Sequence, residues 1–124
     1  MAPRFFRCKH CGNIITLLED SQVPLVCCGE KMVELVPNSM DGANEKHVPI
    51  VKVIGKSAIV EVGSVIHPST AEHHISFIVL ETTSMVQIKY LQNTERPITT
   101  FLLADGEKVV KVFEYCNLHG LWSN

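Results

Sequence analysis

Four of the five cysteines lie within the first 28 residues, and their spacing constrains the fold of this segment more than any other feature of the chain. Cys8 and Cys11 form a C-x-x-C pair, and Cys27 and Cys28 follow as an adjacent pair. Four thiolates in this arrangement suit one tetrahedral metal ion, either zinc or a mononuclear iron. The segment has too few apolar residues for an independent core. We therefore expect the metal to contribute much of its folding free energy.

The residues around these cysteines lead to further expectations about the site. Gly12 and Gly29 follow the two pairs, where a positive φ would let backbone N–H groups point at the sulfur atoms. Two adjacent cysteines cannot reach one ion with the relaxed geometry of a C-x-x-C loop, so we expect a distorted tetrahedron, which can tune a redox centre. A zinc site that only stabilises the fold is the alternative. His10 is expected to be exposed, because four sulfurs already fill the coordination sphere.

The composition excludes several classes of protein. A hydrophobic content of 46% with 19% charged residues is typical of a globular domain rather than a disordered chain. Eleven basic and thirteen acidic residues give a net charge of −2 without a basic cluster, so we expect no nucleic-acid partner. No apolar run is long enough for a membrane span or a signal region. Without such a run we expect a cytoplasmic protein, and in its reducing compartment the crowded cysteines, odd in number, favour metal ligation over disulfides.

The rest of the chain alternates short apolar runs with turn-forming residues, a pattern that predicts a mainly β fold. Two short strands are expected at 14–18 and 32–36, followed by a linker over 37–44. Beyond the linker, six or seven short strands predict an antiparallel β-sandwich of the immunoglobulin type. Gly55 and Lys56 would join the first two of these strands as a hairpin. The strands expected in the sandwich are 48–54, 57–62, 74–81, 85–91, 98–103 and 109–115.

The fifth cysteine begins a C-x-x-H pair near the end of the sequence. Cys116 and His119 can close a small chelate on one metal ion through sulfur and nitrogen, provided that the backbone turns between them. Asn117 and Gly120 permit such a turn. By itself, such a pair is also compatible with a buried thiol beside a surface histidine.

Upstream histidines strengthen the case for a second metal site. His47, His67 and the adjacent pair His73 and His74 lie at expected strand ends and loops, where a scaffold usually positions chemistry. Four imidazoles and one thiolate would make a five-coordinate sphere with one vacancy. Neighbouring residues at the entrance to a strand point to opposite sides, so we expect only one member of the adjacent pair to bind.

These motifs, in this order, resemble the desulfoferrodoxin family, the two-iron form of superoxide reductase, over essentially the whole chain. The resemblance implies a small desulforedoxin-like Fe(Cys)4 domain over 1–37 and a catalytic immunoglobulin-like β-sandwich over 38–124. It also implies that the member of the histidine pair that binds is His73, by its spacing from His67. The motifs concerned are C-K-H-C-G, C-C-G-E-K-M, E-K-H-V-P, H-P-S-T-A-E-H and C-N-L-H-G-L-W.

The resemblance implies two mononuclear irons and the ligands of each. The catalytic iron would have four histidines in a plane and a thiolate on the axis. Glu45 would be its sixth ligand in the oxidised state, and Lys46 would attract superoxide. The ligands implied for the first iron are Cys8, Cys11, Cys27 and Cys28, and those for the catalytic iron are His47, His67, His73, His119 and Cys116.

The activity implied is the one-electron reduction of superoxide to hydrogen peroxide. The enzyme would draw electrons from rubredoxin or a similar donor, and the family resemblance also implies a homodimer. Two alternatives arise from the residues alone. A copper electron carrier of the cupredoxin type would use two histidines, one cysteine and a weak axial ligand such as methionine, but four histidines compete here and no methionine follows His119. A zinc-ribbon interaction module with incidental histidines is the second alternative.

Overall fold

The computed structural model describes residues 2–124 and divides into two compact units between Val36 and Pro37. We call them the cysteine-rich unit and the sandwich unit. Both consist almost entirely of β-strands, and the one helix among the described residues has four residues. The expected mainly β fold, a small cysteine-rich part followed by an antiparallel sandwich, is confirmed. No described helix has the length and apolar character needed to span a bilayer.

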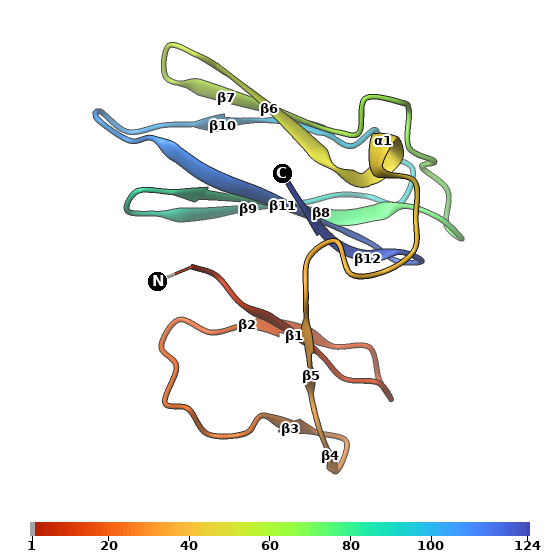
Figure 1. The fold of residues 1–124 in the computed structure, drawn as a ribbon. Coiled ribbons are helices and arrows are strands. Elements are labelled where there is room, and N and C mark those ends of the chain that lie inside the picture. Colours follow the sequence, from red (N-terminus) through yellow and green to blue (C-terminus); the bar gives the residue numbers. More distant parts are fainter. Residues whose placement is uncertain (1) are drawn as a thin grey trace. The chain divides into compact units, whose positions relative to one another are not determined.

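The cysteine-rich unit contains two small antiparallel sheets (Figure 1). The larger has the strand order β2-β1-β5, and the smaller pairs β3 with β4. Strands β2 and β5 fall within the runs expected at 14–18 and 32–36. The bounds are β1 Phe5–Arg7, β2 Ile14–Thr16, β3 Val26–Cys27, β4 Glu30–Lys31 and β5 Val33–Leu35.

The core of this unit is small. Among residues 2–36, the buried hydrophobic side chains are Phe5, Phe6 and Cys8. The guanidinium of Arg4 lies 5.1 Å from the centre of the Phe6 ring and also pairs with acidic side chains of this unit. So few buried apolar residues agree with the expectation that a metal ion stabilises this part of the chain.

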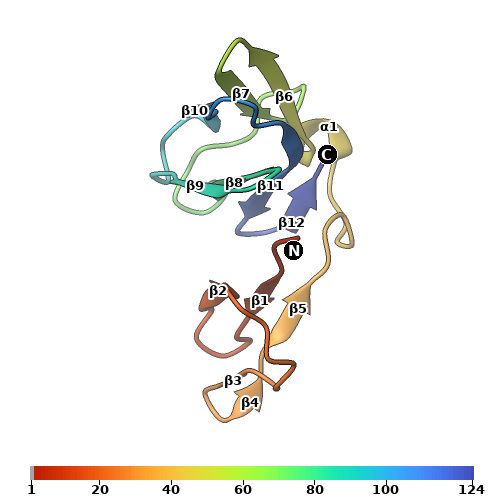
Figure 2. The same ribbon diagram turned by 90° about the vertical axis from the view of Figure 1, so that its left-hand side faces the viewer.

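The sandwich unit consists of two antiparallel sheets (Figures 1 and 2). Apolar side chains pack between them. One sheet has the order β10-β7-β6 and the other β12-β11-β8-β9. The core between them includes Val60, Ile78, Leu80 and Val112, all of which are fully buried. The bounds are α1 Asn44–His47, β6 Pro49–Ile54, β7 Ser57–Val62, β8 Ile75–Thr82, β9 Val86–Tyr90, β10 Ile98–Leu102, β11 Val109–Cys116 and β12 Gly120–Ser123.

The six strands expected in the sandwich are present within one or two residues of their expected ends. The hairpin of β6 and β7 has Ile54 opposite Ser57, and Gly55 at its turn has φ of 59°. Strand β12 and helix α1 were not expected, because four residues are too few for a periodic pattern. The turn that Asn117 and Gly120 permit does form, and Gly120 has φ of 82°.

The segment expected as a linker has no regular structure until α1, but its start is fixed to β12. The backbone N–H of Asn38 donates to the carbonyl of Leu121 over 2.9 Å. The side chain of Asn38 accepts a hydrogen bond from the N–H of Ser123 and donates one to its carbonyl. Met40 then covers Gly120 so closely that a Cβ there would lie 2.6 Å from the methionine sulfur.

Candidate metal centres

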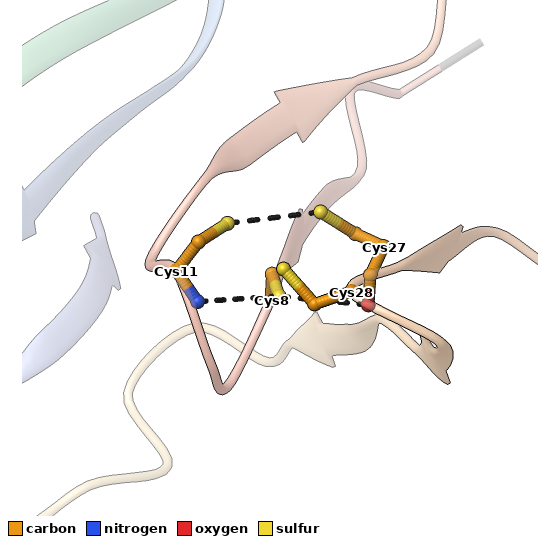
Figure 3. Close-up of side chains that lie close together, drawn as sticks. All are labelled: Cys8, Cys11, Cys27 and Cys28. Carbon is orange, nitrogen blue, oxygen red and sulfur yellow. Dashed lines mark hydrogen bonds between the residues drawn. The ribbon is translucent and has the colours of Figure 1, made fainter.

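The four cysteines of the cysteine-rich unit converge on one point (Figure 3). Cys8 follows β1, Cys11 lies in the turn after it, and Cys27 and Cys28 lie at the β3–β4 turn. Their four sulfur atoms all lie within 4.8 Å of one another. The sulfurs of Cys11 and Cys27 are 3.7 Å apart. A tetrahedral ion with metal–sulfur bonds of 2.3 Å would separate its ligands by about 3.8 Å, so this group fits a metal ion.

Backbone N–H groups point at these sulfurs, as the glycine positions predict. The N–H of Cys11 donates to the sulfur of Cys8, and the N–H of Asn13 donates to the sulfur of Cys11, each over 3.5 Å. Hydrogen bonds from the backbone N–H groups of Cys11 and, to a lesser extent, of His10 lower the pKa of Cys8 to about 6. Both Gly12 and Gly29 have positive φ. The thiolate form of Cys8 is therefore stabilised before any metal binds, whereas hydrogen bonding, first of all with Cys11, raises the pKa of Cys27 and raises that of Cys28 to about 12.

The adjacent cysteine pair has a conformational cost. Cys28 has φ of 53°, a left-handed conformation that costs an L-residue about 1–2 kcal/mol. This conformation turns the chain so that both neighbouring sulfurs face the same point. His10 lies outside the group, exposed, with its Nε2 2.5 Å from a carboxylate oxygen of Glu30.

Five further donors gather at one end of the sandwich unit, from three parts of its sequence. His47 is the last residue of α1, and His67 and His73 lie in the connection between β7 and β8. Cys116 ends β11, and His119 lies in the turn that leads to β12. Strand pairing brings these parts together, because Cys116 lies opposite Ile75 at the start of β8.

The four imidazole rings form a closed circle. Neighbouring rings meet edge to face, with centroids 4.6–5.1 Å apart, whereas the rings of His47 and His73 face each other across the circle at 6.4 Å. The ligand atoms of His47, His67, His73 and Cys116 all lie within 4.8 Å of one another. His119 is outside that set, but its Nδ1 lies 3.7 Å from the sulfur of Cys116. The structure thus brings all five predicted ligands to one place, four of them at close range.

Hydrogen bonds at the outer nitrogens orient two of the rings. Nδ1 of His47 lies 2.8 Å from the carbonyl oxygen of Ala43, and Nδ1 of His67 lies 2.7 Å from that of Pro68. A carbonyl accepts a hydrogen bond from an N–H group, so each ring has its proton on Nδ1 and a lone pair on Nε2. The two Nε2 atoms lie 3.3 Å apart. Two lone pairs at this distance repel each other unless a cation lies between them.

The electrostatics of the histidines also favours metal binding. Burial lowers the pKa of His67 to about 4 and lowers the pKa values of His47 and His73 as well. These rings are therefore neutral at neutral pH, which is the form that ligates a metal. Nε2 of His73 is buried without a hydrogen-bond partner among residues 2–124. A buried polar atom that faces other donors and lacks a partner fits a missing metal ion.

The adjacent His74 is held elsewhere. Its Nδ1 lies 2.9 Å from the carbonyl oxygen of Thr70, and it does not belong to the group of close donor atoms. The structure therefore shows that His73, and not His74, faces the other donors, a choice that the residues alone left open.

Cys116 lies in the interior of the sandwich. Its side chain is fully buried, and burial raises the pKa of the thiol. Glu114, two residues earlier on the same strand, is also fully buried, and burial raises its pKa well above the usual carboxyl value. Burial thus disfavours the charged form of both groups, and a cation at the histidines would favour the thiolate of Cys116.

Helix α1 places Glu45 and Lys46 directly before His47. Glu45 is exposed and Lys46 is half-buried. After burial and the neighbouring His119, the positive charge of Lys46 is a further cause that lowers the pKa of His47. The positive charge of Lys46 therefore has an electrostatic effect on the histidine cluster.

Three other residues that shape this site were not predicted from sequence. Trp122 stacks on the ring of His47 at 5.0 Å and donates a hydrogen bond from Nε1 to the carbonyl of His119. Gly63 lets the chain pass so close to α1 that a Cβ would lie 2.6 Å from the carbonyl oxygen of Glu45. Asn117 hydrogen-bonds to both chain neighbours of His73. The C-N-L-H-G-L-W motif contains two of the three, but their contacts depend on how the strands pair.

The fold and the two donor groups define a metalloprotein with a four-sulfur site and a separate histidine–cysteine site. Family models confirm this description: the desulfoferrodoxin model matches residues 39–124, and the model of the desulfoferrodoxin N-terminal domain matches residues 3–35. The chain belongs to the desulfoferrodoxin family. It is 42% identical over 119 residues to a desulfoferrodoxin from Syntrophotalea carbinolica, covering 96% of this chain and 93% of the relative. It is 39% identical over 117 residues to one from Nitratidesulfovibrio vulgaris, covering 94% and 91%.

The chain is also similar in fold to solved structures of superoxide reductases. The superoxide reductase from Treponema pallidum superposes with a TM-score of 0.84 at 34% identity, covering all of this chain and 99% of that one. The superoxide reductase (1Fe-SOR) from Giardia intestinalis superposes with a TM-score of 0.57 at 32% identity, covering 64% of this chain and 95% of that one.

Proposed function

We propose that this protein is a superoxide reductase, which adds one electron and two protons to superoxide and releases hydrogen peroxide. The observation that carries the proposal is the circle of four imidazoles beside the buried sulfur of Cys116, in a fold shared with superoxide reductases. These donors suit one mononuclear iron, and the four sulfurs of the cysteine-rich unit suit a second.

The roles of the residues follow from their positions. His47, His67, His73, His119 and Cys116 would hold the catalytic iron, and Cys8, Cys11, Cys27 and Cys28 the first iron. When bound, the catalytic iron supplies the electron that reduces superoxide. The carbonyls of Ala43 and Pro68 hold two of the rings with Nε2 inward. Cys116 contributes a thiolate that water does not reach, because its side chain is fully buried.

Helix α1 would contribute the two remaining functional side chains. Lys46 would attract the superoxide anion, because it is half-buried next to the cluster and its positive charge contributes to lowering the pKa of His47. Glu45 would be the sixth ligand of the oxidised iron, from the turn of helix that also contains His47. The hydrogen bond from the N–H of Val65 to the carbonyl of Glu45 fixes this turn to the connection after β7.

The proposal extends to the surroundings of the enzyme. Residues 1–37 and 38–124 would be separate domains, since few apolar side chains are buried in the first and the second has its own core. The donor of electrons would be rubredoxin or a similar small carrier. We also propose a cytoplasmic homodimer. None of the five cysteines forms a disulfide, which supports a reducing compartment.

Metal analysis together with product stoichiometry tests the function. Purified protein should contain two irons per chain and, with a reductant present, should form one hydrogen peroxide for each superoxide consumed. A dismutase would form half as much. Copper at the histidines would support the electron-carrier alternative, and a single zinc would support a structural module. Protein with both irons that leaves superoxide unchanged would overturn the proposal.

Loss of the first iron should spare the superoxide chemistry. We expect Cys11→Ser to halve the iron content and remove the absorption of the four-sulfur site. The rate constant with superoxide should stay within about twofold, because the two sites share no ligand and changes at sites without shared partners act independently. Cys11 is exposed, so the substitution leaves no core cavity. Pulse radiolysis of parent and variant measures the rate, and a variant that loses its activity together with this iron would contradict the separation of the two sites.

A further inference from the structure

Asn117 connects the two segments that contain His73 and the Cys116–His119 pair. Its side-chain oxygen accepts a hydrogen bond from the backbone N–H of His74 over 2.9 Å. Its side-chain amide donates to the carbonyl of Glu72, also over 2.9 Å. The bonded residues are therefore the two neighbours of His73 in the chain.

The backbone of Asn117 adds a third hydrogen bond to the same place. Its N–H donates to the carbonyl of His74 over 3.2 Å. This bond lies where the pairing of β11 with β8 is irregular, between Tyr115 and Cys116. The register of the ladder thus shifts just before Cys116, which still pairs with Ile75, and Asn117 continues the connection beyond this pair.

The segment around His73 has few other attachments to β11 or β12. Thr70 hydrogen-bonds with the backbone of His73, but both lie in the same connection between β7 and β8. Nε2 of His73 itself has no partner among residues 2–124. Neither contact links His73 to Cys116; beyond the strand pair of Cys116 with Ile75, the hydrogen bonds of Asn117 make that link.

We propose that Asn117 is a positioning residue that holds His73 in place relative to Cys116 and His119. Its amide offers an acceptor and two donors on one short side chain, so it can bond to a backbone N–H and a backbone carbonyl together. An aspartate would keep only the acceptor, and an alanine would keep neither. The inference rests on the proposed function in one respect: it takes His73 to be a ligand of the catalytic iron.

Replacement of Asn117 should therefore loosen the metal more than the fold. Asn117 is exposed, so its removal creates no cavity in the core. Loss of a residue that orients a metal ligand commonly weakens metal binding by about 10–100-fold. We expect Asn117→Ala to release the catalytic iron to a chelator about tenfold faster or more than the parent. Asn117→Asp should release iron at a rate between those of the parent and Asn117→Ala, because it keeps the bond to the N–H of His74.

Gln87→Ala is the matched control. The side-chain amide of Gln87 donates to the carbonyl of Leu102 over 2.9 Å, so this variant also loses a bond from a side chain to a backbone carbonyl. Gln87 pairs with Leu80 on β8, five residues along that strand from Ile75 beside the cluster. We expect this control to release iron at the parent rate.

The experiment compares the full-length iron-loaded parent and the three variants. Iron release to a chelator and the visible thiolate-to-iron absorption are followed together with the melting temperature. Faster release and a shifted absorption band in Asn117→Ala but not in Gln87→Ala are expected. Parent-like release and absorption in Asn117→Ala, or equal changes in both alanine variants, would overturn the inference. Because these measurements require no superoxide, a parent that binds iron but does not reduce superoxide would contradict the proposed function separately.

Discussion

Cys116→Ser should abolish the reduction of superoxide while the sandwich stays folded. Serine is close to cysteine in size, so the buried position is filled. Its hydroxyl is a harder and weaker donor that stays neutral, and it cannot replace the electron donation of a thiolate to iron. The variant should retain the four-sulfur iron, because those ligands lie in the other unit. The measurement is the rate of superoxide decay after pulse radiolysis, with iron content determined on the same sample.

The same chemical change at the other site serves as the control for this variant. Cys11→Ser also replaces one cysteine ligand by serine, and it should keep the superoxide activity while losing the first iron. The two variants should therefore have opposite phenotypes. A Cys116→Ser protein that reduces superoxide at the parent rate would remove the thiolate from the mechanism.

Lys46→Ile should lower the second-order rate constant with superoxide by about tenfold or more at low salt. Superoxide is an anion that approaches a protein of net charge −2, so attraction must come from the site itself. A half-buried lysine next to the cluster provides local positive charge, and such fields raise association rates by about 10–10³-fold. Salt screens the attraction over about 10 Å at 0.1 M. The rate of the variant should therefore depend less on ionic strength than that of the parent.

Glu45→Gln provides the matched charge control. It removes a negative charge from the residue next to Lys46, so the first encounter with superoxide should be as fast as in the parent or faster. Rate constants are measured by pulse radiolysis over a range of ionic strengths. If Lys46→Ile has the rate and the salt dependence of the parent, Lys46 does not steer the substrate.

The positions of the larger strands were predictable from the sequence because each has a run of apolar residues bounded by turn formers. The hairpin at Gly55 is the clearest case, since a glycine at the turn fixes which residues pair. Strands β1, β3, β4 and β12 have only two to four residues each. Such short strands are determined by what they pair with, and a periodic pattern cannot reveal them.

The candidate donors could be named in advance, but not their geometry. The motifs, read with the family resemblance, pointed to five candidate ligands in the sandwich unit, and the structure brings all five together. The edge-to-face circle of rings depends on the β11–β8 register and on the carbonyls that bind Nδ1 of His47 and His67. The close passage at Gly63 and the stacking of Trp122 on His47 likewise require two segments distant in the sequence to meet.

The two donor groups differ in how much of the chain must be synthesised before all of their donors are present. The sulfur ligands span 28 − 8 = 20 positions, and the histidine–cysteine ligands span 119 − 47 = 72. Closing a longer loop costs more entropy, and domains form from the N-terminal side during synthesis. The first metal can therefore bind while the ribosome is still making the sandwich. The second donor group is complete only after β11 has paired with β8, so the two metal sites become available at different stages of synthesis.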